Sequence, residues 1–201
     1  CKVYGVQKRL KLCMVGNFVR GRSQIVVARA LARLDAMRLD SSNLDATHLA
    51  IPSFDVYFVG KKRESEGWRY DECVRYCEEN GLMNHVHFVG GRGDVPAILQ
   101  HVDGFVYASE HDTFGIAVVE AMANGVPVIV NDWDVMREIT HDGEWATIYK
   151  TGDSEDCAKA IRNLLEHIEE EKGRAKKVSS VVRNTYSIEA HMQRLAAVYL
   201  G

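Results

Sequence analysis

The sequence lacks any run of about 18 or more apolar residues, and its N-terminus lacks the charged-then-apolar pattern of a secretory signal. Its five cysteines are odd in number and form no Cys-x-x-Cys pair, which excludes a disulfide framework and a zinc ribbon. We therefore expect a cytoplasmic protein without a transmembrane segment.

Neither sign of charge is in large excess. The sequence has 25 Lys and Arg residues and 28 Asp and Glu residues, so its overall field does not favour nucleic acid as a partner. With only 3 prolines among 201 residues and 46% hydrophobic residues, the composition is that of a globular protein. We expect a single domain over residues 1–201, cut from a longer chain because it begins at Cys1 rather than Met.

Apolar runs alternate with segments of helical period, which is typical of parallel strands joined by helices. This predicts the α/β class with a sheet of about six strands. The expected strands cover residues 11–15, 56–59, 85–89, 105–107, 126–130 and 145–149. Helices are expected over residues 23–37, around 70–77, at 114–124, near Met136, at 158–168 and at 188–199. A further short helix, capped by Asp94, is expected directly after that residue. The 40–53 connection is longer than usual and predicts an edge extension or a mobile flap.

Several residues with metal-binding chemistry have simpler interpretations. Cys73 and Cys77 extend the apolar stripe of a helix, which places them in the core. His85 and His87 share one face of a strand without a third ligand nearby, which favours a packed or solvated pair. Residues 132–134, Asp-Trp-Asp, match a D-x-D metal motif, but the second Asp is better explained as a helix cap. We expect no metal site.

The strongest signal of a functional site is a pair of carboxylates, Asp112 and Glu120, on either side of the predicted helix start near Phe114. Backbone amides at a helix N-terminus bind anions, and Gly115 allows close approach of a ligand. Glu120 lies in an apolar helix, where a carboxylate needs a partner such as a ribose hydroxyl. Considered alone, an acid before a helix is usually only a cap.

Residues 109–129 resemble the E-x7-E signature of the retaining glycosyltransferases of family four, which reads S-x-x-E-x-F-G, four residues, then E-A-M-A-x-G-x-P-V-I. The residues that match in register are Ser109, Phe114, Gly115, Glu120, Ala121, Met122, Ala123, Gly125, Pro127, Val128 and Ile129. Asp112 stands where the family has Glu, and its side chain is one methylene shorter.

The loop after the first expected strand carries a second part of the resemblance. It looks like the family's V-G-R-x4-K-G loop, in which Arg and Lys hold the donor diphosphate. Gly16 matches, Asn17 occupies the Arg position and Arg22 occupies the Lys position. Arg20 is a candidate to compensate for the lost cation.

The resemblance extends from about residue 11 to residue 199. The strands that end at Gly60 and Gly90 resemble two further landmarks, and the nucleotide base sits at the second. This implies a GT-B protein with two Rossmann-like domains facing across a cleft, of which the chain is the C-terminal, donor-binding half. The N-terminal acceptor domain would precede Cys1 and could attach the protein peripherally to a membrane, and the isolated half would be inactive.

The implied activity is retaining, metal-independent hexosyl transfer from a UDP- or GDP-sugar to a glycan or glycolipid, without a cofactor, as in polysaccharide assembly. Asp112 would be the catalytic residue beside the anomeric carbon, and Glu120 would bind the ribose. The other implied donor-binding residues are Gly16, Asn17, Arg20, Arg22, Gly90, Thr113, Phe114, Gly115 and Ile116.

Two other functions stay open at this point. Residues 16–23 fit the P-loop pattern G-x4-G-K-S except that Arg22 replaces the Lys, which makes an NTP-binding hydrolase the first alternative. The second is a non-catalytic nucleotide-binding module, in which Asp112 and Asn17 mark lost activity.

Overall fold

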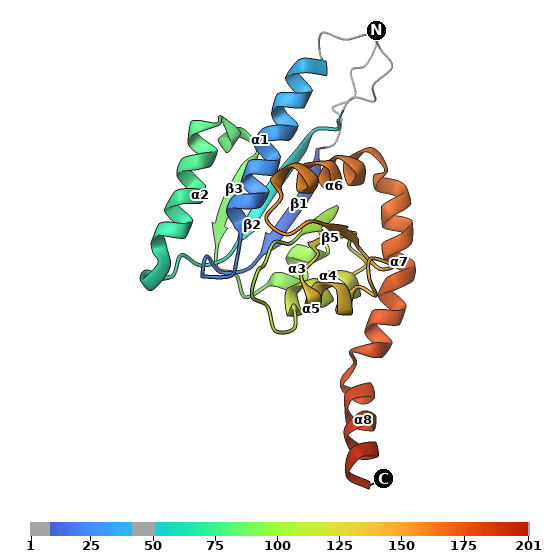
Figure 1. Ribbon diagram of the computed structural model, residues 1–201. Helices are drawn as coiled ribbons and strands as arrows, with labels where there is room; N and C mark the ends of the chain where they lie inside the picture. The colour runs from blue at the N-terminus through green and yellow to red at the C-terminus, as the bar shows by residue number, and fades with distance from the viewer. Residues whose placement is uncertain (1–8, 42–50, 201) are drawn as a thin grey trace.

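The computed structural model describes residues 9–41 and 51–200, which form one six-stranded sheet with helices on both faces (Figure 1). The strand order is β3-β2-β1-β4-β5-β6, and all neighbouring strands are parallel. The strands are β1 Leu10–Val15, β2 Phe54–Val59, β3 Val86–Gly90, β4 Gly104–Val106, β5 Val128–Asn131 and β6 Thr147–Tyr149. The predicted α/β class with six strands is confirmed, and the sheet is Rossmann-like.

The strands are continuous apolar runs because both faces of the sheet are covered. One face packs against α1 Gln24–Ser41, α2 Gly67–Glu79 and α6 Ser154–Glu166. The other packs against α3 Val95–Leu99, α4 Ile116–Ala123, α5 Asp134–Ile139 and α7 Ile168–Thr185. Alternate residues of β1 serve the two cores: Leu12 and Met14 face the first group of helices, and Cys13 faces the second.

The structure revises the bounds of several predicted helices. The helix expected over 114–124, α4, begins at Ile116 with Gly115 as its N-cap residue. The helix expected over 158–168 is divided, because α6 ends at Glu166 and α7 begins at Ile168, with a break at His167. The first helix continues beyond residue 37 to Ser41. The central part of the expected 40–53 flap, residues 42–50, lies outside the described residues.

The expected shared face of His85 and His87 is wrong. His85 is buried and packs edge-on against Phe54, whereas His87 stacks on Tyr57 on the opposite face of the sheet. The reason is that His85 precedes β3 and has a ψ of 1°, so the alternation of an extended strand does not apply to it. Cys73 and Cys77 are fully buried in the core, as predicted.

The last helix, α8 Ile188–Leu200, extends away from the sheet and its covering helices (Figure 1). Its apolar side chains are exposed, with Ile188 78% and Tyr199 83% accessible to solvent. Across residues 9–41 and 51–200, the structure contains no helix that is both long and apolar enough to span a bilayer.

Candidate functional site

Except for Gly90, which ends β3, the residues predicted to bind a ligand all lie in the segments that follow β1 and β4, which are neighbours in the sheet. From β1 the chain proceeds to β2 on one side, and from β4 it proceeds to β5 on the other. In a parallel sheet, such a reversal of strand order opens a crevice that ligands occupy. The loops after β1 and β4 lie on the two sides of this point.

The loop after β1 is held against the end of β2. The N–H of Gly16 donates to the carbonyl oxygen of Val59 at 2.9 Å, and a Cβ on Gly60 would lie 1.9 Å from the carbonyl oxygen of Gly16. Glycine is therefore required at position 60. The Oδ1 atom of Asn17 accepts the N–H of Lys61 at 2.9 Å, so this predicted donor-binding side chain fastens the loop to β2.

The geometry of this loop does not support the P-loop alternative. Phe18 is buried, with its ring centroid 4.9 Å from that of Tyr70, so the loop folds onto the core. The amide of Gln24 donates to the carbonyl oxygens of Gly16 at 3.0 Å and Asn17 at 3.2 Å. A P-loop instead wraps its backbone around a phosphate and directs its cation into that space.

Arg22 and Asp112 form the centre of the site, although 90 residues separate them in sequence. Arg22 Nη1 lies 2.6 Å from Asp112 Oδ2, which also accepts the hydroxyl of Tyr107. The guanidinium carbon lies 4.8 Å above the centre of the Tyr107 ring. Asp112 Oδ1 accepts the N–H groups of Phe114 at 3.2 Å and Gly115 at 3.0 Å. The predicted diphosphate-binding cation and the predicted catalytic acid are thus in direct contact.

This arrangement changes the expected role of two backbone amides. Those of Phe114 and Gly115, expected to face a leaving group, donate to Asp112. Asp112 thus connects the Arg22 guanidinium to the loop before α4. Arg22 is better placed for a ligand, because a guanidinium has five N–H groups and the Asp112 contact engages only Nη1.

The remaining predicted residues of this segment have different environments. Thr113, Phe114 and Ile116 are exposed, and the ring of Phe114 packs 5.7 Å from that of Tyr186. Glu120 is half-buried in α4, and its carboxylate has no hydrogen bond or ion pair with any described residue. It does not line the two cavities that adjoin the β1 loop.

One of these cavities, of about 320 Å³, joins the loops that follow β1, β2 and β3. Its walls include Gly16 and Asn17 together with the cations Lys61, Arg63 and Arg92. Gly90 ends β3 beside it with a φ of +70°, and its carbonyl oxygen accepts the N–H of Gly60 at 2.9 Å. The three strand ends therefore surround a space with positive charge.

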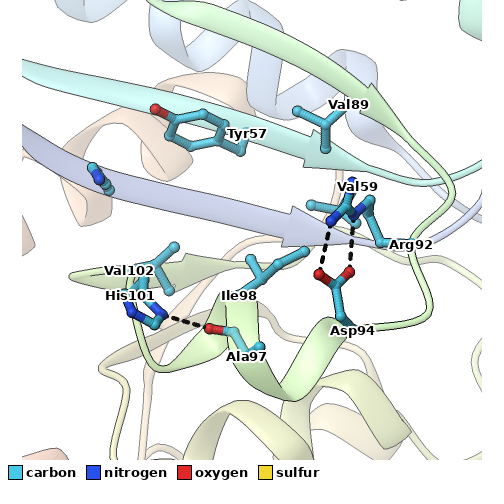
Figure 2. Close-up of a pocket in the computed structure, with 10 residues that line it drawn as sticks. Tyr57, Val59, Val89, Arg92, Asp94, Ala97, Ile98, His101 and Val102 are labelled. Atoms are coloured by element: carbon cyan, nitrogen blue, oxygen red, sulfur yellow. Dashed lines mark hydrogen bonds and ion pairs between the residues drawn. The ribbon is translucent and has the colours of Figure 1, made fainter.

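A groove of about 420 Å³ lies next to it, between the sheet and α3 (Figure 2). Tyr57 and Val89 line it from the strands, and Ile98 lines it from α3. At one end, Arg92 donates two hydrogen bonds to Asp94, at 2.9 and 2.7 Å. Asp94 is the N-cap residue of α3, as predicted, but its carboxylate bonds Arg92 rather than an N–H group of the helix. This contact lowers the pKa of Asp94 below its usual value.

The D-x-D tripeptide has structural roles. Asp132 Oδ1 accepts the N–H of Thr151 at 2.7 Å and its hydroxyl at 2.6 Å, which lowers the pKa of the carboxyl group. Asp134 is the first residue of α5 rather than its cap, which is Trp133. Within residues 9–41 and 51–200, no three His, Cys, Asp or Glu side chains are grouped as metal ligands.

Sequence reasoning missed the cations Lys61, Arg63 and Arg92 and the hydroxyl of Tyr107. A signal for the first two was present, because three basic residues, Lys61 to Arg63, directly follow Gly60 at the carboxyl end of a strand. The Tyr107 contact with Asp112 depends on the loop conformation, which no short-range pattern specifies.

Comparison with known proteins identifies relatives of this chain. A family model described as "Glycosyl transferases group 1" matches residues 3–179. A phosphatidyl-myo-inositol mannosyltransferase of Mycobacterium leprae is 35% identical over 100 residues, which are 48% of this chain and 27% of that protein. A putative glycosyltransferase, EpsD, of Bacillus subtilis is 34% identical over 114 residues, which are 57% of this chain and 29% of that protein.

Solved structures share the fold. HepE of Anabaena, in complex with UDP and glucose, has a TM-score of 0.81 at 20% identity, and the match covers 95% of this chain and 48% of that one. A glycosyltransferase of Rickettsia africae has a TM-score of 0.82 at 16% identity, covering 96% and 47%. The chain thus spans about half the length of these structures.

Proposed function

The chain belongs to the glycosyl transferases of group 1, and we propose that it is the donor-binding half of a GT-B enzyme of family four. The enzyme transfers a hexosyl group from a UDP- or GDP-sugar to a glycan or glycolipid, with retention and without a metal or cofactor. An N-terminal domain of the same parent chain supplies the acceptor site. The observation that carries this proposal is the contact of Arg22 with Asp112 at the carboxyl ends of β1 and β4.

In the transfer, the acceptor hydroxyl oxygen bonds to the anomeric carbon while the bond from that carbon to a diphosphate oxygen breaks. The electron pair of the broken bond remains on the diphosphate oxygen, which takes up the proton of the acceptor hydroxyl. Positive groups fixed beforehand near the leaving oxygen stabilise this developing charge. Arg22 is such a group, because Asp112 and the Tyr107 ring hold its guanidinium in place. Lys61 lies near the position where Asn17 replaces the Arg of the family loop and supplies the second cation.

Glu120 is the proposed ribose ligand. The carboxylate of Glu120 is half-buried and has no hydrogen bond or ion pair with any described residue, so both of its oxygens can accept hydrogen bonds from a ligand. A ribose hydroxyl would supply the partner. The base would then lie toward Gly90, where UDP or GDP can reach the space between the strand ends.

The test is calorimetric titration of UDP, GDP and their sugar conjugates. We expect Glu120→Gln to weaken the binding of free nucleotide and sugar nucleotide alike, by about tenfold, because one charge-assisted hydrogen bond is lost. Glu144→Gln, at an exposed position outside the site, serves as the control and is expected to bind as the original chain does. Unchanged affinity of Glu120→Gln would remove the ribose assignment.

A non-catalytic nucleotide-binding module is the second candidate, and the occupied carboxylate of Asp112 favours it. Both Asp112 oxygens already accept hydrogen bonds, so the side chain has less capacity for sugar hydroxyls. The full-length parent protein, assayed with a panel of UDP- and GDP-sugars, distinguishes the two candidates: nucleotide binding without turnover would favour the module.

A further inference from the structure

Four arginines line a cavity of about 440 Å³ that adjoins the β1 loop and shares no lining residue with the 320 Å³ cavity. Arg20 and Arg22 come from the loop, Arg29 comes from α1, and Arg69 comes from the first turn of α2. Glu110 is the only acidic residue among the residues that line this cavity. We call the cavity the arginine pocket.

The charge of the arginine pocket is not cancelled by its surroundings. Asp112 neutralises Arg22, and Glu66 lies 3.0 Å from Arg69. Arg20 and Arg29 have no carboxylate partner within ion-pair distance among the described residues. Glu110 adds a third carboxylate, so four guanidinium groups face three carboxylates and one positive charge remains in excess, on a chain whose net charge is −3. Such a concavity attracts anions against the field of the whole molecule.

Neither Arg29 nor Arg69 has a role in the donor site or a large one in the fold. Arg29 is exposed, and its guanidinium carbon lies 5.9 Å from the ring centre of Tyr76. Arg69 contacts its near neighbours on the chain, Glu66 and the ring of Trp68. Surface contacts of this kind contribute little stability, so the convergence of these side chains on one pocket is not explained by folding.

We propose that the arginine pocket binds a phosphate or diphosphate group of the acceptor, the rest of which is held by the N-terminal acceptor domain of the parent chain. This inference rests on the proposed function, since it names the chemical class of the second substrate. Guanidinium groups bind phosphate oxygens through paired N–H donors. A volume of about 440 Å³ exceeds a single phosphate and suits a phosphorylated head group.

The position of the pocket fits this role. Arg22 is part of its wall and also part of the donor centre, so an anion here lies directly beside the donor site. Oε1 of Glu110 accepts a hydrogen bond from the hydroxyl of Ser23 at 3.1 Å. An acceptor held by its phosphate in the arginine pocket would present its hydroxyl next to the transferred sugar.

The experiment is calorimetric titration of inorganic diphosphate and of geranyl diphosphate into the chain saturated with UDP, so that the donor site is filled. Three chains are compared: the original, the double variant Arg29→Ala with Arg69→Ala, and the control Arg75→Ala. Arg75 is an exposed arginine of α2 that does not line the pocket. Thermal unfolding verifies that all three are folded.

We expect both diphosphates to bind the UDP-loaded original and Arg75→Ala, and the double variant to lose about tenfold or more in affinity for them. The UDP affinity should be equal in all three chains. Absence of diphosphate binding, equal binding by the double variant, or binding of inorganic diphosphate without geranyl diphosphate would overturn the inference.

Failure of the proposed function has a different signature. If the chain does not bind UDP or GDP, the donor assignment fails. The diphosphate titration without nucleotide then still reports whether Arg29 and Arg69 bind a diphosphate, and loss of that binding too would remove the pocket as an anion site.

Discussion

Arg22 and Asp112 both differ from the residues of the family resemblance, where Lys and Glu occupy these positions. Each change alters the reach of a side chain: the guanidinium of Arg extends further than the ammonium of Lys, and Asp is one methylene shorter than Glu. In the structure the two side chains meet at 2.6 Å. The simplest interpretation is that the two replacements compensate each other.

A double-mutant cycle tests this compensation. We expect Arg22→Lys and Asp112→Glu each to lower the free energy of unfolding by about 1–2 kcal/mol, because the contact is partly buried and one partner no longer fits. The loss of unfolding free energy in the double variant should be smaller than the sum of the two single losses, by about 1 kcal/mol. Urea unfolding measures all four chains, and strictly additive losses would show that the two residues act independently.

Among the elements, α7 and α8 contribute very differently to stability. Ala175, Val178 and Val182 of α7 are buried, and the two valines belong to the core that contains α4. The apolar side chains of α8 are exposed, and its contact with α7 includes a hydrogen bond from Arg194 to the carbonyl oxygen of Thr185 at 3.0 Å. Helices gain most of their stability from packing, so α8 gains little.

Removal of residues 188–201 is therefore expected to leave the Tm of the chain nearly unchanged, while the helical signal in circular dichroism falls. Val182→Ala in α7 is the comparison and is expected to lower the free energy of unfolding by about 1–3 kcal/mol, because a fully buried side chain is shortened. A large loss of Tm on removing α8 would mean that it packs on the body of the protein in solution.

For the molecule as a whole, stability depends on pH through a buried histidine. Burial lowers the pKa of His85 below its usual 6.5, although the carboxylate of Asp35, 3.4 Å from Nε2, acts in the opposite direction. Arg9 and Arg38 lower this pKa further, and Asp55 raises it. His85 therefore binds its proton at a lower pH in the folded chain than in the unfolded chain, where it does so near pH 6.5.

The free energy of unfolding should consequently rise with pH between the lowered pKa and about 6.5, and this contribution should be constant above that range. Urea unfolding at a series of pH values measures the slope. In His85→Gln the slope over this range should shrink, whereas His191→Gln, at an exposed position of α8, should keep it. An equal slope in both variants would assign the effect to other groups.

The sheet could be predicted from the sequence because strands that are buried on both faces are continuous apolar runs. Such a run can be recognised without knowing which strands lie beside it. The sequence did not reveal the break at His167, because the apolar spacing continues from Leu164 and Leu165 to Ile168 across it. Nor did it reveal the contact of Arg22 with Asp112, since 90 residues separate them and only the sheet order brings β1 and β4 together. The roles of Asp112, Glu120 and the donor-binding loop stay predictions.

Within residues 9–41 and 51–200, the edge strands of the sheet are β3 and β6, which are five and three residues long. An edge strand exposes unpaired N–H and C=O groups that can template the addition of a strand from another molecule. Short edges offer few such groups, and β3 ends at Gly90, whose positive φ turns the backbone out of the extended conformation. The edges of the folded sheet therefore offer little template for edge-to-edge aggregation.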